Sequence, residues 1–271
     1  MSQRRILNKL TPLIGAEITN VDLASPSEGL IAQLKQDLND HHVIFFHDQQ
    51  LTLDQFKAFG RAFGPLHIHG VANPTFPQHP EVIVIETDEN STFVAGERWH
   101  SDASADAEPP FGTILYMHVV PEHGGGDTLF ASTCDAYDAL SSAMKRFLDG
   151  LTAVHDGERL RGLAGIRNQE KRLPANEHPV VRTNPETGRK GIYVNRVYTS
   201  HIVGLPKAES EAILSFLYTH MEQPLFQCRF KWSPGSIAFW DNRFSLHHAV
   251  WDYFPDRRMA QRITVCGERP A

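Results

Sequence analysis

Alternating and continuous apolar runs along the chain predict a protein built mainly from short strands. Residues 13–23 alternate apolar and polar positions, which is the pattern of a strand with one buried face. Residues 42–47 form a continuous apolar run, which indicates a fully buried strand. Further segments with strand patterns lie at residues 81–86, 111–119, 128–131, 151–155 and 259–266.

Two hairpins are expected in the second half of the chain. The first joins residues 178–182 to residues 192–194 across an Asn-Pro-Glu-Thr-Gly turn. The second joins residues 227–232 to residues 236–240 across a Ser-Pro-Gly turn. In both, strand-forming runs flank residues that favour tight turns, which is the usual signature of paired neighbouring strands.

Four segments carry apolar residues at helical spacing. They are residues 27–39, a segment from Thr52 to the Gly64-Pro65 stop, residues 134–149 and residues 207–221. Ser27, Thr52 and Thr133 stand at the starts of the first three as caps. In the last helix we expect Ile213, Phe216, Leu217 and His220 to point inward.

These elements favour a mainly β fold with flanking helices, a β-sandwich or jelly roll. Strands and helices do not alternate strictly, which argues against a doubly wound sheet. Residues 156–177 are charged and without periodicity, so a surface excursion is expected there. We find no internal repeat and no low-complexity linker, so residues 1–271 are predicted to form a single domain.

Composition excludes several classes of protein. Apolar residues make up 41% and charged residues 21%, as in ordinary globular enzymes, and the net charge of −6 does not favour nucleic-acid binding. No apolar run approaches the ~18–20 residues that span a membrane, and no secretion signal is recognised at the start. Three widely separated cysteines suit neither a disulfide framework nor a cysteine zinc site, which predicts a cytoplasmic protein.

The candidate chemistry centres on His100 and Asp102. On extended backbone, side chains two residues apart point to the same face, so both can reach one metal ion. His247, which follows the second predicted hairpin, can supply a second imidazole from a neighbouring strand. Two histidines and one carboxylate form the facial triad of non-haem Fe(II) oxygenases. Arg258 could bind the far carboxylate of a 2-oxo acid bound to that metal, since its planar fork suits carboxylates.

Motifs along nearly the whole chain resemble the Fe(II)/2-oxoglutarate dioxygenases of the taurine dioxygenase and 2,4-dichlorophenoxyacetate dioxygenase (TauD/TfdA) family. They include Trp99-His100-Ser101-Asp102, Gly125-Gly126-Asp127-Thr128-Leu129, His178-Pro179-Val180-Val181, Trp240-Asp241-Asn242-Arg243 and the segment from Arg257-Arg258 to Arg262. The resemblance implies a double-stranded β-helix, or jelly roll.

The resemblance also implies the roles of individual residues. His100, Asp102 and His247 would hold Fe(II), and Thr128 and Arg258 would bind the co-substrate 2-oxoglutarate. The prime substrate would be anchored through its anionic group by Arg262, with His69 and Tyr198 as further contacts. The implied reaction consumes O2 and 2-oxoglutarate and hydroxylates a C–H bond of the substrate. A homodimer or homotetramer is expected.

Three substrate-pocket positions differ from the taurine enzymes. Ala72, Gly96 and Gly157 stand where those enzymes are expected to have a tyrosine, an asparagine and an aromatic residue. A wider and less polar pocket favours a larger organic anion: an alkyl or aryl sulfonate, an alkyl sulfate or an aryloxy-carboxylate. Hydroxylation beside that group would make the product collapse and release sulfite, sulfate or a phenol.

Other interpretations stay open. The protein could be a taurine dioxygenase proper, a hydrolase with Zn²⁺ on the same triad, or a binding module without activity, although the intact ligands argue against the last. Arg262 could form a structural salt bridge, and Tyr198 could simply pack. His248 is expected to point away from the site, and Asp241 and Arg243 are expected to stabilise the turn before His247.

Overall fold

A computed structural model describes residues 4–68, 76–163 and 172–271, and its larger sheet has seven strands in the order β1-β2-β3-β13-β5-β15-β4. These are β1 (Ile6–Lys9), β2 (Ala16–Thr19), β3 (Val43–Phe46), β13 (Ile237–Asp241), β5 (Gly112–Val119), β15 (Arg258–Val265) and β4 (Ile83–Thr87). All neighbours pair antiparallel except β2 and β3. Strands distant in sequence therefore lie side by side at the centre of this sheet.

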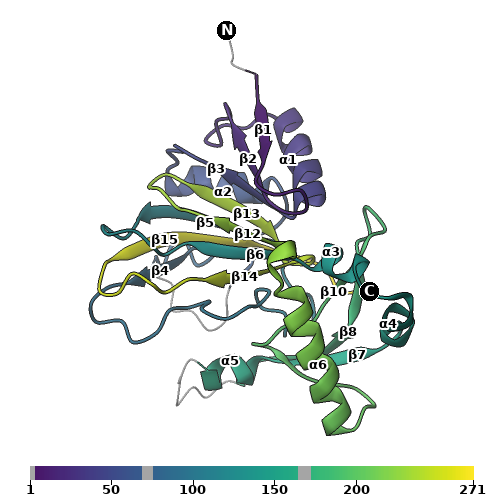
Figure 1. Cartoon of the computed structure of the whole chain (residues 1–271). Helices are drawn as coiled ribbons and strands as arrows, with labels where there is room; N and C mark the ends of the chain where they lie inside the picture. Colours follow the sequence, from purple (N-terminus) through teal and green to yellow (C-terminus); the bar gives the residue numbers. More distant parts are fainter. Residues whose placement is uncertain (1–3, 69–75, 164–171) are drawn as a thin grey trace.

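A smaller sheet packs against one face of the larger sheet (Figure 1). It contains β12 (Gln227–Phe230), β6 (Thr128–Ser132) and β14 (Ser245–Ala249), in that order and all antiparallel. Phe45 of the larger sheet stacks on Phe230 of the smaller one with ring centroids 4.0 Å apart, and Phe130 meets Phe45 edge-on at 5.5 Å. Two facing sheets around an aromatic core form a jelly roll, as predicted.

Two helices cover the opposite face of the larger sheet (Figure 1). They are α1 (Glu28–His41) and α2 (Leu53–Arg61). The Ser27 hydroxyl accepts a hydrogen bond from the Leu30 amide, and Thr52 forms a capping box with Gln55, so two of the three predicted caps are confirmed here. The helices therefore cover the face of the larger sheet that points away from the smaller sheet.

The remaining elements lie beside the jelly roll and pack around a separate apolar core. A three-stranded sheet has the order β11 (Thr199–Ile202), β7 (Thr152–Asp156), β8 (Ala175–Pro179), and β9 (Val181–Thr183) pairs with β10 (Lys190–Ile192). The helices are α3 (Thr133–Asp138), α4 (Ser142–Leu148), α5 (Gly157–Leu163), α6 (Lys207–Met221) and the 3-10 turn η1 (Pro224–Phe226). The hairpin predicted around the Asn-Pro-Glu-Thr-Gly turn is confirmed as β9–β10.

The second predicted hairpin is wrong. β12 belongs to the smaller sheet and β13 to the larger one, so the Ser-Pro-Gly turn carries the chain from one sheet to the other. β13 is bonded on one side to β3 and on the other to β5, and these partners occupy both of its edges. Turn chemistry alone could not reveal that better-packed partners come from far away in sequence.

Three helical details also differ from prediction. The expected helix over residues 134–149 is two helices: Ser132, rather than the predicted Thr133, caps α3, and Ser141 caps α4. In α6 the buried residues are Ser210, Leu214, Leu217 and Met221, whereas Phe216 is 43% exposed. The expected excursion over residues 156–177 contains α5 and most of β8.

In the described part of the chain no helix has the length and apolar character needed to cross a membrane.

Candidate active site

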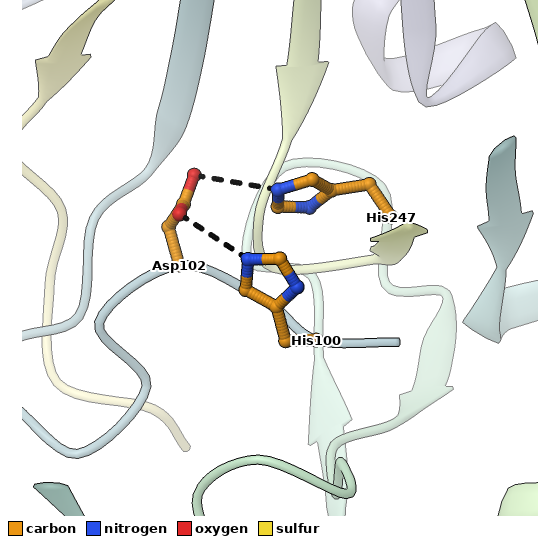
Figure 2. A group of neighbouring side chains, drawn as sticks. All are labelled: His100, Asp102 and His247. Atoms are coloured by element: carbon orange, nitrogen blue, oxygen red, sulfur yellow. Dashed lines mark ion pairs between the residues drawn. The ribbon is translucent and has the colours of Figure 1, made fainter. Parts of the chain in front are cut away.

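The three predicted metal ligands come together where the segment of His100 and Asp102 pairs with β14. The backbones of His100 and His247 exchange two hydrogen bonds, of 3.1 and 2.9 Å, although 147 positions separate them in the chain (247 minus 100). One ligand atom from each of His100, Asp102 and His247 lies within 4.8 Å of the others, and all three residues are buried. Figure 2 shows both imidazoles turned toward the carboxylate, with His100 Nε2 3.7 Å from Oδ1 and His247 Nε2 3.9 Å from Oδ2.

Burial and neighbouring charges hold the three groups in their metal-binding protonation states. Burial lowers the pKa of His100, and burial together with the nearness of the His100 imidazole lowers the pKa of His247 well below its usual value. Burial alone would raise the pKa of Asp102, but Arg262, then His247 and His100, hold it well below its usual range. Two neutral imidazoles and one carboxylate result, which is the donor set that suits Fe(II).

Hydrogen bonds fix the orientation of His100 and Asp102. His100 Nδ1 donates to the Arg98 carbonyl at 2.7 Å, because a carbonyl only accepts, and this leaves the Nε2 lone pair facing the cluster. Thr113 Oγ1 donates to Asp102 Oδ2 at 2.8 Å. In turn, Asn242 Nδ2 donates to Thr113 Oγ1 at 2.8 Å, and Trp240 Nε1 donates to Asn242 Oδ1 at 3.0 Å.

The loop that carries Asp102 is strained and tightly held. Ala103 has a φ of +45°, a left-handed conformation that is uncommon for a residue with a side chain. The next residue, Ser104, is fully buried, and its hydroxyl lies 2.9 Å from both His155 Nδ1 and Asn195 Nδ2. These bonds hold the sharp turn that follows Asp102 and so keep its carboxylate beside the histidines.

Arg262 contacts one of the three predicted ligands directly. Its Nη1 donates to Asp102 Oδ1 at 3.0 Å, while its buried Nε has no hydrogen-bond partner among the described residues. Tyr198 is buried nearby, and its pKa is raised by burial and by the negative charge of Asp102. Arg262 therefore forms an ion pair with a predicted metal ligand and still has N–H groups for a bound anion.

Thr128 and Arg258 both contact Trp232. The indole Nε1 donates to Thr128 Oγ1 at 3.0 Å, and the Arg258 Cζ lies 5.9 Å from the centre of the Trp232 rings. Arg258 is buried, which lowers its pKa, and its Nε donates to the Gly126 carbonyl at 3.1 Å. In the sheet Thr128 pairs with Ala249, two residues after His247, so this region borders the metal ligands.

The other residues singled out from the sequence lie as follows. His248 contacts the Trp99 ring at 5.5 Å, and Arg243 forms a buried two-nitrogen ion pair with Asp241, which stabilises the turn before His247 as expected. His69 and Ala72 lie outside the described residues. Thr113, Asn242 and Trp232 were missed as site residues, although the Trp-Asp-Asn-Arg motif contains one of them.

The two glycines of the expected wider pocket are both closely surrounded. A Cβ atom at Gly96 would lie 3.3 Å from His100 Cε1 and 3.7 Å from the Ala249 Cβ, and the φ of +90° at Gly96 disfavours any side chain there. At Gly157 a Cβ atom would lie 2.7 Å from the Leu173 Cβ, so packing of Leu173 already fills that space. Neither glycine therefore opens additional space in the site.

Known proteins resemble this chain over almost its full length. The "Taurine catabolism dioxygenase TauD, TfdA family" matches residues 7–264. An alpha-ketoglutarate-dependent sulfonate dioxygenase of Saccharomyces cerevisiae is 36% identical, over 97% of this chain and 67% of that protein. An alkylsulfatase of Acinetobacter baylyi is 32% identical, over 98% and 86%. The crystal structure of a taurine dioxygenase from Burkholderia xenovorans has a TM-score of 0.86 at 35% identity, over 98% and 91%.

The family match, the likeness to a solved dioxygenase and the buried cluster of possible metal ligands agree with one another. They confirm the predicted fold and the predicted enzyme class, with Fe(II), 2-oxoglutarate and O2 as its cofactor and co-substrates. The chain belongs to the TauD/TfdA family of Fe(II)- and 2-oxoglutarate-dependent dioxygenases.

Proposed function

We propose that this enzyme hydroxylates a small organic anion at a centre where His100, Asp102 and His247 hold Fe(II). The observation that carries the proposal is the buried cluster of three ligand atoms within 4.8 Å, in which burial keeps the histidines neutral and Arg262 keeps the carboxylate ionised. Fe(II) bound there supplies the O2-activating chemistry of the family. The protein contributes ligand orientation and a site largely closed to water.

2-Oxoglutarate is bound by a guanidinium and by a hydroxyl group. Arg258 offers a planar pair of N–H groups to the carboxylate distant from the metal, since its Nε is already used by the Gly126 carbonyl. Thr128 supplies a hydroxyl to a carboxylate oxygen. Both side chains are buried, so these charge-assisted hydrogen bonds are stronger than they would be in water.

The prime substrate is an alkyl or aryl sulfonate, an alkyl sulfate or an aryloxy-carboxylate, with its anionic group on Arg262. Relatives named a sulfonate dioxygenase and an alkylsulfatase support this range. Tyr198 and His69 are further proposed contacts. Hydroxylation of the carbon that bears the sulfonate, sulfate or aryloxy group gives an adduct that splits into a carbonyl compound and sulfite, sulfate or a phenol.

The test is a screen for succinate formation and O2 consumption with Fe(II), 2-oxoglutarate and a panel of these anions, with taurine as the second candidate. Taurine belongs in the panel because the similar Burkholderia xenovorans structure is named a taurine dioxygenase. We expect succinate to rise with at least one larger anion and the released sulfite, sulfate or phenol to match it in amount. Product formed without O2 and 2-oxoglutarate would instead indicate a hydrolase.

Cytoplasmic location, a homodimer or homotetramer and a single domain over residues 1–271 remain predictions. Size-exclusion chromatography with light scattering would measure the subunit number directly.

A further inference from the structure

We propose that Trp232 is a positioning residue for 2-oxoglutarate, which directs the Thr128 hydroxyl and supports the Arg258 guanidinium at the same time. The inference depends on the proposed function, in which these two residues bind the co-substrate. Trp232 contacts both side chains, whereas no pattern in the sequence connects the three. It lies just beyond the end of β12, at the turn that carries the chain between the two sheets.

The hydrogen bond between Trp232 and Thr128 has only one possible direction. An indole N–H donates and cannot accept, so Thr128 Oγ1 is the acceptor in their 3.0 Å contact. The hydroxyl hydrogen of Thr128 then remains to be donated elsewhere. A carboxylate oxygen can only accept, so Trp232 leaves Thr128 in the state that matches an incoming carboxylate.

The same indole limits how Arg258 can move. Its ring centre lies 5.9 Å from the Arg258 Cζ, at the outer range of a cation–π contact, and Gly126 accepts from the Arg258 Nε. No hydrogen bond engages the two terminal nitrogens of Arg258 within the described residues. The guanidinium is thus held by Gly126 at its Nε and by the Trp232 ring, while its two terminal nitrogens remain available to a carboxylate.

Trp232 is itself firmly held. It is buried, and Phe230 meets it edge-on with centroids 4.9 Å apart. Phe230 in turn stacks on Phe45 in the aromatic core between the sheets. The position of the indole is therefore set by the packing of the jelly roll, and 2-oxoglutarate meets donors that are already oriented before it binds, which lowers the entropy cost of binding.

The experiment measures equilibrium binding of 2-oxoglutarate with Mn(II) in place of Fe(II), by calorimetry, for Trp232→Phe, Thr128→Val and the double variant. We expect Trp232→Phe to weaken 2-oxoglutarate binding about tenfold, for the loss of one directing hydrogen bond and part of the ring contact. The effect of Thr128→Val should be smaller in the Trp232→Phe background than in the wild type, because both changes break the same hydrogen bond between Trp232 and Thr128. Trp251→Phe, whose ring contacts Phe254 instead, is the matched control and should bind as the wild type does.

Two further measurements separate positioning from general damage. In turnover, Trp232→Phe should raise the KM for 2-oxoglutarate and leave the KM for the prime substrate and the affinity for Mn(II) alone unchanged. β-(3-Benzothienyl)alanine at position 232 keeps the shape of the indole and replaces its N–H with sulfur. It should weaken 2-oxoglutarate binding about fivefold, and this variant decides the question if Trp232→Phe does not fold.

The inference is overturned if both position-232 variants bind 2-oxoglutarate as the wild type does while Thr128→Val and Arg258→Ala bind it weakly. Strictly additive effects of Trp232→Phe and Thr128→Val would overturn it as well. If the wild-type protein with Mn(II) does not bind 2-oxoglutarate at all, the proposed function itself fails, and the two failures are thus distinguishable.

Discussion

Replacing Arg258 with alanine should cost the enzyme most of its affinity for 2-oxoglutarate. The guanidinium is buried, and its two terminal nitrogens are free to form two parallel hydrogen bonds to one carboxylate. A hydrogen bond to a charged group contributes about 1.5–3 kcal/mol, so losing two of them costs about 3 kcal/mol or more. At about 1.4 kcal/mol per factor of ten, the dissociation constant should rise at least a hundredfold.

The assay compares Arg258→Ala with Arg262→Ala at saturating metal. For Arg258→Ala we expect the KM and Kd for 2-oxoglutarate to rise at least a hundredfold, with little change in the KM for the prime substrate. For Arg262→Ala the prime substrate should be affected instead. If both variants lose 2-oxoglutarate alike, or if Arg258→Ala changes its affinity less than tenfold, the assignment of the two arginines is wrong.

Three more predictions follow from contacts around the site. Thr113→Val removes the donor to Asp102 Oδ2 and should weaken Mn(II) binding about 10–100-fold in a calorimetric titration, and an unchanged affinity would contradict the proposed orienting role. Burial lowers the pKa of His155 to about 3, so this histidine stays neutral in the folded protein while the unfolded chain takes up a proton below about pH 6.5. His155 should therefore lower the free energy of unfolding by about 2 kcal/mol between pH 7 and pH 5. In urea unfolding, His155→Gln should lose about 2 kcal/mol less than the wild type over this pH range. Arg243→Met leaves the fully buried Asp241 carboxylate without its cation and should lower the free energy of unfolding by about 3–5 kcal/mol, whereas the double change with Asp241→Asn should recover much of this loss.

The sequence predicted strands more reliably than their partners. Alternation and apolar runs report whether a segment is extended and buried, and both hold for β13 whichever strand lies beside it. The Ser-Pro-Gly turn before β13 satisfied the local rules for a hairpin, yet β3 and β5 occupy the two edges of this strand. Pairing is decided by which buried surfaces fit, and that information is spread over the whole chain.

In the candidate site, too, the residues could be predicted from the sequence but their arrangement could not. His100 and Asp102 could be found from their spacing, and His247 from the family motif around it. Their orientation could not be predicted, because Thr113 reaches Asp102 from β5 and the network continues through Asn242 to Trp240 on β13. These are ordinary residues in strand patterns, and only their proximity in the fold gives them a role in the site.

The charges of the site also limit its substrate. With both histidines neutral, the ionic groups of the proposed site are the buried Asp102 and Arg258 and the partly buried Arg262, which together carry one positive charge. The nearby buried Asp127 is paired with Arg229, so this pair adds no net charge. Fe(II) adds two positive charges and 2-oxoglutarate two negative ones, so one positive charge remains. A buried site is most stable when its charges cancel, since uncompensated charge is costly in a medium of low polarity. For the proposed function we therefore predict a substrate with a single negative charge, such as a sulfonate, a sulfate monoester or a carboxylate, rather than a neutral molecule or a dianionic phosphate ester.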